Sequence, residues 1–388
     1  MERSGDLVVR LMNKARFSIG VLFFICGLNF ATWATRIPDF KAYLSLSDAQ
    51  LGTVLMGLPI GSLVSLPIAG WLLTKYASRW ICLMAVAMYV IVIPGLSVMS
   101  SATTLFMGLF FFGMAGDIMN IAMNTQVVSL ESKMNKTIMS SFHAIFSLGL
   151  MAGALVGGIF EKENFTPLEH FSSIALANIL IIPFSFGSLL KDKPVRDENK
   201  PNSSILNLGP YLIILSLIAF CGMLCEGAMA DWISLYFKEY SPNSPFPITI
   251  GFSFFAAAMV LGRFFGDRIS MNYGVSAILI LNGILVSLGM LTTLLFASIY
   301  IKVFGCFVIG IGISTIVPLI YSQAGNQKEI MPSIAIAGVS TIAYVGFLLG
   351  PVLIGYLSDF VGLDKALFLI VFLGFLAAFI SKNWVKVK

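Results

Sequence analysis

The chain has 388 residues, of which 58% are hydrophobic and 11% are charged, with a mean hydropathy of +0.92. An ordinary soluble domain has about 25% charged residues, so this chain has too few to cover a surface in water. The composition excludes a pair of soluble globular domains, a disordered chain and a nucleic-acid-binding protein. The five cysteines lie in apolar stretches and lack the spacing of a disulfide framework or a zinc site. We therefore predict an integral membrane protein without a metal or cofactor.

The apolar stretches predict twelve spans, because a membrane-spanning helix needs about 20 mostly apolar residues. In the first half the stretches are 17–35, 49–74, 80–116, 137–160 and 171–190, and 80–116 divides into two helices near Pro94-Gly95 and Ser100-Ser101. In the second half they are 210–237, 248–266, 269 to about 298, 298 to about 323, 333–358 and 366–381. The prediction is an all-α integral membrane fold.

A polar linker separates the two sets of spans. It covers residues 191–208 and contains the run KDKPVRDENKPNSS, whose charges and prolines favour a solvated connector. We expect an N-terminal six-helix bundle over 1–190 and a C-terminal six-helix bundle over 209–388. Most Lys and Arg residues fall on one side when both termini are cytoplasmic, as the positive-inside rule predicts for a multi-pass protein of the cytoplasmic (inner) membrane. The net charge of +5 is thus explained by the Lys and Arg residues of the cytoplasmic face.

The two halves have similar loops after their second helices. The first runs from Gly70 through Lys75 to Arg79, and the second is the string GRFFGDR, which contains Arg263, Asp267 and Arg268. Both resemble the signature loop of the major facilitator superfamily, where a glycine turn, an acid and basic partners latch the two halves on the cytoplasmic side. The first copy has Thr74 at the usual position of the acid.

Glycines repeat at four-residue spacing on the fifth helix of each half. Gly149, Gly153 and Gly157 lie on one face of the first, and Gly346 and Gly350 lie on the second. Small residues let helices approach closely in lipid. The spacing fits either static packing or a seam along which helices slide.

Three acids lie inside predicted spans: Asp117, Glu226 and Asp231. A charge at the centre of a spanning helix costs about 2.5–3.5 kcal/mol, so such residues usually face a cavity or a partner. Asp117 shares one face of the fourth span with Asn120 and Asn124, which follow at three- and four-residue steps. Because burial favours the protonated form of a carboxyl group, the acids are candidates for proton coupling. The alternative is a structural pair with a basic residue.

The first span has a polar face of its own. Asn29, Thr32, Trp33 and Arg36 follow at three- or four-residue steps, and Arg36 lies at the outer end. Arg36 either clamps a substrate anion or anchors the helix at the membrane interface.

The two histidines have different expected surroundings. His143 lies about two turns into the fifth span, where it either relays protons or bonds to a neighbouring helix. His170 is expected in a solvated outer loop. Three aromatic residues are placed near a central cavity: Trp232, Tyr321 and Tyr344.

Several strings together resemble the YbjJ-like branch of the major facilitator superfamily, which is distantly similar to fucose permease. They are GLNFATWATRIP (27–38), LSDAQLG (46–52), MNIAMN (119–124), His143 with SLG (147–149), EGAMADW (226–232) and GRFFGDR (262–268). The resemblance implies two pseudo-symmetric six-helix bundles, a central cavity and alternating access. In the fucose-permease-like pattern, an acid precedes an asparagine by four residues on helix four. Here Asn124 matches the asparagine, Asn120 stands in place of the acid, and Asp117 is one turn away, so Glu226 becomes the expected proton carrier.

These features predict a secondary active transporter that moves a small polar solute, such as a sugar or sugar derivative, with a proton as the coupling ion. Membrane lipid is the expected surrounding and a monomer the expected state. Efflux of an amphipathic compound and uncoupled facilitated diffusion are alternatives within transport, and a non-transporting receptor or scaffold is the alternative from another class. An enzyme is not expected, because the sequence contains neither GxxxxGK[ST] nor HExxH.

Overall fold

The computed structural model describes residues 2–134, 138–192, 208–327 and 332–385, and its regular structure in these ranges is helical. The chain forms two compact units. Unit 1 contains Met1–Arg36 and Gly57–Lys200, and unit 2 contains Ile37–Met56 and Pro201–Lys388. Most of the predicted linker, residues 193–207, lies outside the described residues.

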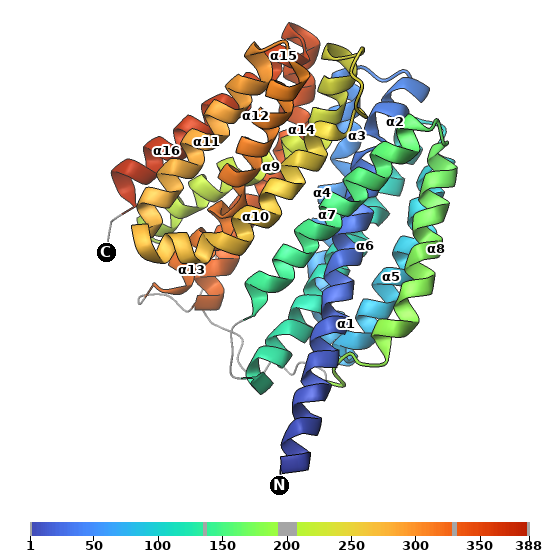
Figure 1. Cartoon of the computed structure of the whole chain (residues 1–388), viewed down its shortest axis with the longest axis vertical. Coiled ribbons are helices and arrows are strands. Elements are labelled where there is room, and N and C mark those ends of the chain that lie inside the picture. Colours follow the sequence, from blue (N-terminus) through green and yellow to red (C-terminus); the bar gives the residue numbers. More distant parts are fainter. Residues whose placement is uncertain (1, 135–137, 193–207, 328–331, 386–388) are drawn as a thin grey trace. The chain divides into compact units, whose positions relative to one another are not determined.

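Unit 1 consists of long helices that run from blue to green in Figure 1. They are α1 (Glu2–Ala34), α4 (Gly57–Lys75), α5 (Ser78–Leu96), α6 (Ala102–Met134), α7 (Met139–Lys162) and α8 (Pro167–Phe186). The start of α8 follows from its sequence, because Thr166 and Glu169 form a capping box and Pro167 occupies the first helical position.

Unit 2 combines six spans of the second half with two short helices from the first half (Figure 1). The short helices are α2 (Ile37–Tyr43) and α3 (Asp48–Leu55). The remaining helices are α9 (Pro210–Tyr240), α10 (Ile250–Tyr273), α11 (Val275–Leu295), α12 (Ile299–Ser314), α13 (Ile316–Gly325), α14 (Pro332–Val361), α15 (Leu363–Ala366) and α16 (Phe368–Trp384). Two predicted spans are therefore broken, the second between α3 and α4 and the tenth between α12 and α13.

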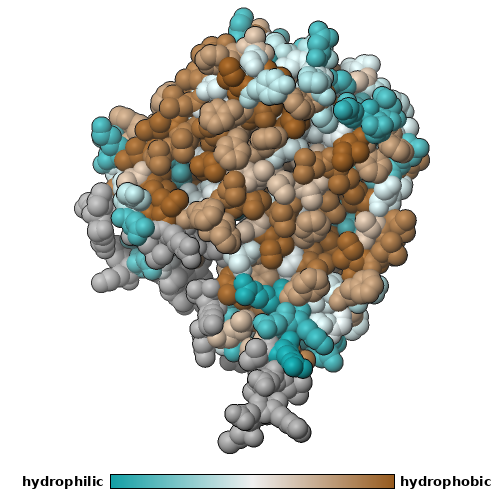
Figure 2. Space-filling view, viewed as in Figure 1, coloured by the Kyte–Doolittle hydropathy of each residue, from teal (hydrophilic) through white to brown (hydrophobic). Residues whose placement is uncertain are grey.

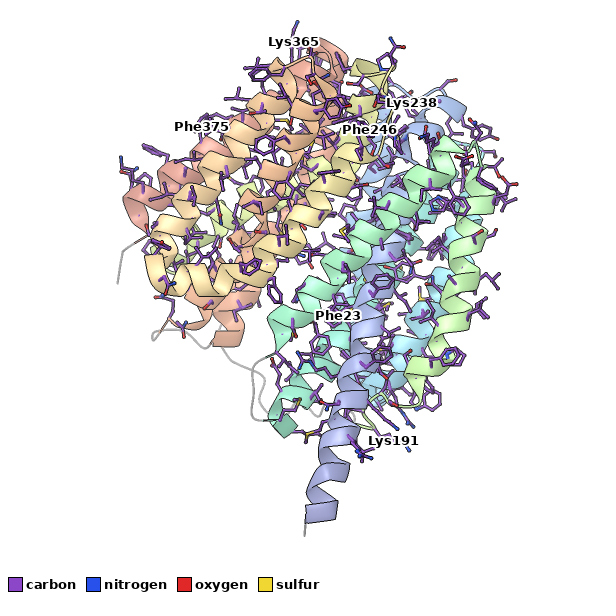
Figure 3. The ribbon with its side chains drawn as sticks, viewed as in Figure 1. Phe23, Lys191, Lys238, Phe246, Lys365 and Phe375 are labelled. Atoms are coloured by element: carbon purple, nitrogen blue, oxygen red, sulfur yellow. The ribbon has the colours of Figure 1, made fainter. Side chains whose placement is uncertain are left out.

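The helices have the length and apolar surface of membrane spans. In the described ranges, eleven helical segments are long and apolar enough to cross a membrane, and Ile250–Gly266 of α10 is a shorter apolar stretch. Figure 2 shows mostly hydrophobic residues on the visible face of α10, α11 and α12. In Figure 3, Phe375 of α16 points away from unit 2, whereas Lys238 and Lys365 lie at one end of that unit. Apolar side chains thus cover the length of the helices, and charges gather at helix ends.

The same packing recurs in both units. In unit 1, α1 packs on α7, α4 on α6, and α5 on α8; in unit 2, α9 packs on α14, α10 on α12, and α11 on α16. The predicted glycine faces lie in these contacts. A Cβ on Gly149 would collide with the Phe24 carbonyl of α1, and one on Gly346 would collide with the Phe220 carbonyl of α9. The internal repeat is therefore visible as a repeated set of helix pairs.

Candidate functional site

A carboxylate and a guanidinium meet at mid-height in unit 2. Glu226 lies near the middle of the 31-residue α9, and Arg263 lies near the middle of the 24-residue α10. Arg263 Nη2 donates to Glu226 Oε1 at 3.4 Å, and the two side chains are 13% and 22% exposed. Opposite charges that pair lower the cost of placing each other away from water. The ion pair therefore stabilises the charges of Glu226 and Arg263 inside the bundle.

The helix that carries Arg263 is longer than the predicted span. The eighth span was expected to end near residue 266, with Arg263 at its cytoplasmic end, but α10 continues to Tyr273. In the sequence the apolar run ends near Arg263. The sequence alone does not show that Glu226 lies beside Arg263 and neutralises its charge. Asp267 and Arg268 lie on the same helix, and their side chains are outside the described part of the chain.

Two further helices, α13 and α14, pack around this part of α9. Tyr321 of α13 lies within electrostatic range of Glu226 and hydrogen-bonds Ser340 of α14. Tyr344, also on α14, is half-buried. Phe347 of α14 lies against Gly227, where a Cβ would approach its ring to 3.2 Å. Four helices of unit 2, α9, α10, α13 and α14, thus contribute to the surroundings of Glu226.

Asp231 and Trp232 occupy a more enclosed part of α9. Asp231 is 8% exposed, and Trp232 is fully buried. Among the residues that the structure describes, none forms a hydrogen bond or ion pair with the Asp231 carboxyl group. Trp232 lies within the packed interior of unit 2, so its ring is not on an open wall in this conformation.

The polar stripe on α6 forms a connected ladder in unit 1. Ser65 Oγ of α4 donates to Asp117 Oδ2 at 2.9 Å, and Asp117 also interacts with the Asn120 side chain. Asn124 Nδ2 in turn donates to Asn120 Oδ1 at 2.9 Å. Asp117 is buried, whereas Asn120 and Asn124 are half-buried. The ladder therefore leads from an enclosed carboxyl group to two more accessible amides.

The polar face of α1 is turned into unit 1. Asn29 and Trp33 are buried, and Asn29 Oδ1 accepts a hydrogen bond from Asn178 Nδ2 of α8 at 2.8 Å. Arg36 is 2% exposed, and its Nε donates to His170 Nδ1 at 3.1 Å. This geometry favours an internal anchor for Arg36 over a substrate clamp.

His170 is not in a solvated loop, as the sequence analysis expected. It lies in the first turn of α8, is fully buried, and stacks on Phe160 with the ring centroids 4.8 Å apart. The interpretation was wrong because the short loop before Thr166 turns α8 back onto α7 at once. His143, on α7, is half-buried. Its ring makes an edge-to-face contact with Phe23, with the ring centroids 5.6 Å apart.

The first predicted latch loop joins α4 to α5. Lys75 ends α4 and is exposed, and a Cβ on Gly70 would meet no atom within 4 Å. Arg79 lies over the ring of Trp80 at 4.9 Å.

A neighbouring network at this end of unit 1 was missed from the sequence. Gln126 is buried, and its Nε2 donates to Ser78 Oγ at 2.6 Å and to the Leu190 carbonyl at 3.0 Å. Ser78 Oγ donates to Asp192 Oδ2 at 2.6 Å. These bonds fix the residues after α8 to the start of α5.

Within the described residues, no group of three or more His, Cys, Asp or Glu side chains is placed to hold a metal ion. All five cysteines are free and buried.

Comparison with known proteins agrees with the repeated helix pairs. The profile of the Major Facilitator Superfamily matches residues 19–329. The chain belongs to the Major Facilitator Superfamily. It is 32% identical over 353 residues to an uncharacterized MFS-type transporter of Yersinia pestis, covering 90% of each chain. It is 29% identical to the membrane protein MosC of Rhizobium meliloti, covering 93% of this chain and 88% of that protein.

Solved structures of two other transporters share the fold. A mutant of the nucleoside transporter NupG matches with a TM-score of 0.77 at 13% identity, over 96% of this chain and all of that one. A bacterial homolog of the human lysosomal transporter Spinster matches with a TM-score of 0.74 at 14% identity, over 97% and 98% of the two chains. The protein is thus a membrane transporter of the major facilitator type with an all-helical fold, and is not an enzyme.

Proposed function

We propose that this transporter moves a small polar solute, such as a sugar or sugar derivative, across the cytoplasmic membrane by alternating access, coupled to proton binding at Glu226. We further propose that the protein is a monomer and that both of its termini lie in the cytoplasm. Asp117, Asp231 and His143 are secondary candidates for the proton path. The proposed solute contacts are Asn120, Asn124, Tyr321 and Tyr344.

The Glu226–Arg263 pair is the observation that carries the proposal. An ion pair with an N–O distance of 3.4 Å between half-buried groups can be broken by adding a proton to the carboxylate, because the neutral acid no longer attracts the guanidinium. Protonation of Glu226 then changes the charge at mid-height in unit 2. A coupled transporter needs such a group, whose proton occupancy alters the site from within the membrane.

The character of the accessible side chains favours a polar solute over an amphipathic one. Asn120 and Asn124 present amide groups on α6, and Tyr321 presents a hydroxyl group beside Glu226. The large aromatic residues Trp33 and Trp232 are fully buried. An efflux protein for amphipathic compounds needs accessible aromatic surface instead. NupG, with which the chain shares its fold, is a nucleoside transporter, so nucleosides belong among the solutes to be tested.

Proton flux measured in liposomes tests the proposal. The purified protein is reconstituted with the pH dye pyranine trapped inside, and pools of sugars, amino acids, nucleosides and organic acids are added outside. We expect one pool to drive a change in internal pH with the native protein. Glu226→Gln, which cannot take up a proton, should abolish that change but retain exchange of the same labelled solute.

Glu163→Gln is the matched control, because Glu163 is exposed at the end of α7. It should transport protons at the native rate. An undiminished proton flux in Glu226→Gln contradicts the role of Glu226. Solute exchange without proton flux in the native protein supports the uncoupled facilitator.

A further inference from the structure

The break in the tenth predicted span lies at one residue. α12 ends at Ser314 and α13 begins at Ile316, so Thr315 alone lies between the two helices. Pro318 follows in the first turn of α13 and has no N–H group, so it cannot donate the hydrogen bond that a continuous helix would make to the Ser314 carbonyl. The helix backbone alone therefore does not set the direction of α13, and contacts from neighbouring helices have to determine it.

A buried amide group of α11 holds the residue at the break. Asn282 Nδ2 donates to Thr315 Oγ1 at 2.8 Å, and the two residues are 4% and 7% exposed. Gly312 of α12 allows this close approach, because a Cβ there would lie 2.8 Å from the Asn282 carbonyl oxygen. Leaving an enclosed polar group without its partner is costly. Asn282 thus fixes Thr315 to α11.

Helix α10 contacts the same break. A Cβ on Gly262 would collide with the Ser314 side chain, and a Cβ on Gly266 would collide with the Thr315 side chain. These two glycines flank Arg263, which forms the ion pair described above. The break is therefore held by α11 through a hydrogen bond and by the stretch of α10 that carries Arg263 through close packing.

The first residue of α13 packs on the helix that carries Glu226. Ile316 is 2% exposed, and its Cγ2 atom lies 2.9 Å from the position that a Cβ on Gly222 would take, one helical turn before Glu226. Further along α13, Tyr321 lies within electrostatic range of Glu226. Because α13 carries Tyr321 on a continuous helix, a change of direction at Thr315 moves the Tyr321 hydroxyl group relative to Glu226.

We propose that Asn282 is a positioning residue of the site around Glu226: by fixing Thr315, it sets the direction of α13 and holds the Tyr321 hydroxyl group beside Glu226. The inference rests on the proposed function, in which Glu226 takes the proton and Tyr321 contacts the solute. Asn282 acts through Thr315 and α13. Loss of its hydrogen bond raises the fraction of molecules in which the start of α13 has left α9.

Thiol labelling of the purified protein measures this fraction without any solute. The reporter is Ile316→Cys, because Ile316 is buried against Gly222 of α9. A maleimide is added in detergent, and the protein without the reporter gives the background of the five buried native cysteines. We expect Asn282→Leu, which is close in size but has no amide group, to raise the labelling rate of the reporter about fivefold, as for the loss of one buried hydrogen bond.

Thr315→Val removes the same hydrogen bond from its other end and retains the branched shape of the side chain. It should raise the labelling rate by a similar factor. The double variant with Asn282→Leu should exceed neither single variant by more than about twofold, because the two changes remove one shared bond.

Ser287→Ala is the matched control for loss of a buried hydrogen bond on α11. Ser287 is fully buried, and its hydroxyl group donates to the Val371 carbonyl of α16 at 2.8 Å, away from the break. Labelling of the reporter in this variant should remain within about twofold of the rate for the reporter alone.

Solute exchange by the reconstituted protein tests the link to Tyr321. The probe is a tritiated member of whichever pool the native protein exchanges: sugars, amino acids, nucleosides or organic acids. Tyr321→Phe should raise its half-saturating concentration about fivefold, since one hydrogen bond is lost. In the Asn282→Leu protein the same change should add less than about a twofold effect, because the hydroxyl group is already displaced. In the Ser287→Ala protein it should have its full effect.

Labelling at the reporter's own rate in both Asn282→Leu and Thr315→Val overturns the proposal, because other contacts then hold the break. An equal rise in Ser287→Ala also overturns it, since general loosening of α11 then explains the labelling. Independent, additive effects of Asn282→Leu and Tyr321→Phe on exchange contradict the positioning role. If Asn282→Leu does not yield folded protein, Thr315→Val against Ser287→Ala decides the matter.

Failure of the proposed function gives a different result from failure of this inference. A native protein that exchanges none of the four pools contradicts the proposed function, and with it any role of Asn282 in solute binding. The labelling rates still show whether Asn282 sets the position of α13, because they require no solute.

Discussion

Arg36 and His170 form a buried pair that keeps a guanidinium inside unit 1. The Arg36 Nε group donates to an imidazole nitrogen that must be unprotonated to accept, and Phe160 covers the imidazole ring. A polar group enclosed in this way is costly to leave without its partner. The pair therefore contributes to stability by joining the end of α1 to the start of α8.

We expect His170→Ala to lower the stability of the purified protein by about 1–3 kcal/mol, because it removes an acceptor from a buried charged donor. His170→Gln, which retains an acceptor oxygen, should recover part of the loss. Thermal unfolding in detergent measures both. A melting temperature of His170→Ala equal to that of the native protein contradicts a structural role for the pair.

At the same scale, Glu226 could be found from the sequence and its partner could not. A carboxyl group in the middle of an apolar run can be recognised from the sequence alone, since the run of apolar residues around it is local. Arg263 lies at a point where the run appears to end, and only the meeting of α9 and α10 makes it a buried partner. For the same reason, the bonds from Ser65 to Asp117 and from Asn178 to Asn29 were not predicted.

At the scale of elements, glycines determine how closely the paired helices approach. Gly149 brings α7 against the backbone of α1, and Gly346 brings α14 against that of α9. The sequence predicted both faces, because the four-residue spacing is local. The breaks between α3 and α4 and between α12 and α13 were not predicted, since the apolar runs continue through Met56 and Thr315.

We expect Gly149→Ala to destabilise the protein by about 1–3 kcal/mol, because the added methyl group forces α7 away from α1. Gly70→Ala is the matched control: it also replaces a helical glycine, but its Cβ meets open space. It should be neutral or stabilising by up to about 1 kcal/mol, as alanine favours a helix. Equal melting temperatures for the two variants would show that the α1–α7 contact has room for a methyl group.

At the scale of the whole molecule, the distribution of positive charge sets the expected orientation. The fold class and the number of spans were predictable because apolar length and scarce charge are properties of the sequence alone. The assignment of Ile37–Met56 to unit 2 was not, since it depends on contacts with α14 and α9 that are more than 150 residues distant along the chain.

Labelling of intact cells tests the proposed orientation. Tyr76 follows α4 and Glu163 follows α7, and both are exposed. With cytoplasmic termini, Glu163→Cys should react with a membrane-impermeant maleimide added outside. Tyr76→Cys should react only after permeabilisation. The reverse pattern would place both termini outside, against the positive-inside rule.

Through the segment Ile37–Met56, the first half of the chain contributes two helices to unit 2. If the chain were divided at the linker into two polypeptides, the first would carry α2 and α3 without the helices on which they pack, and the second would have α14 uncovered where α3 lies. The arrangement is that of an exchanged arm, as in a domain-swapped dimer, but within one chain.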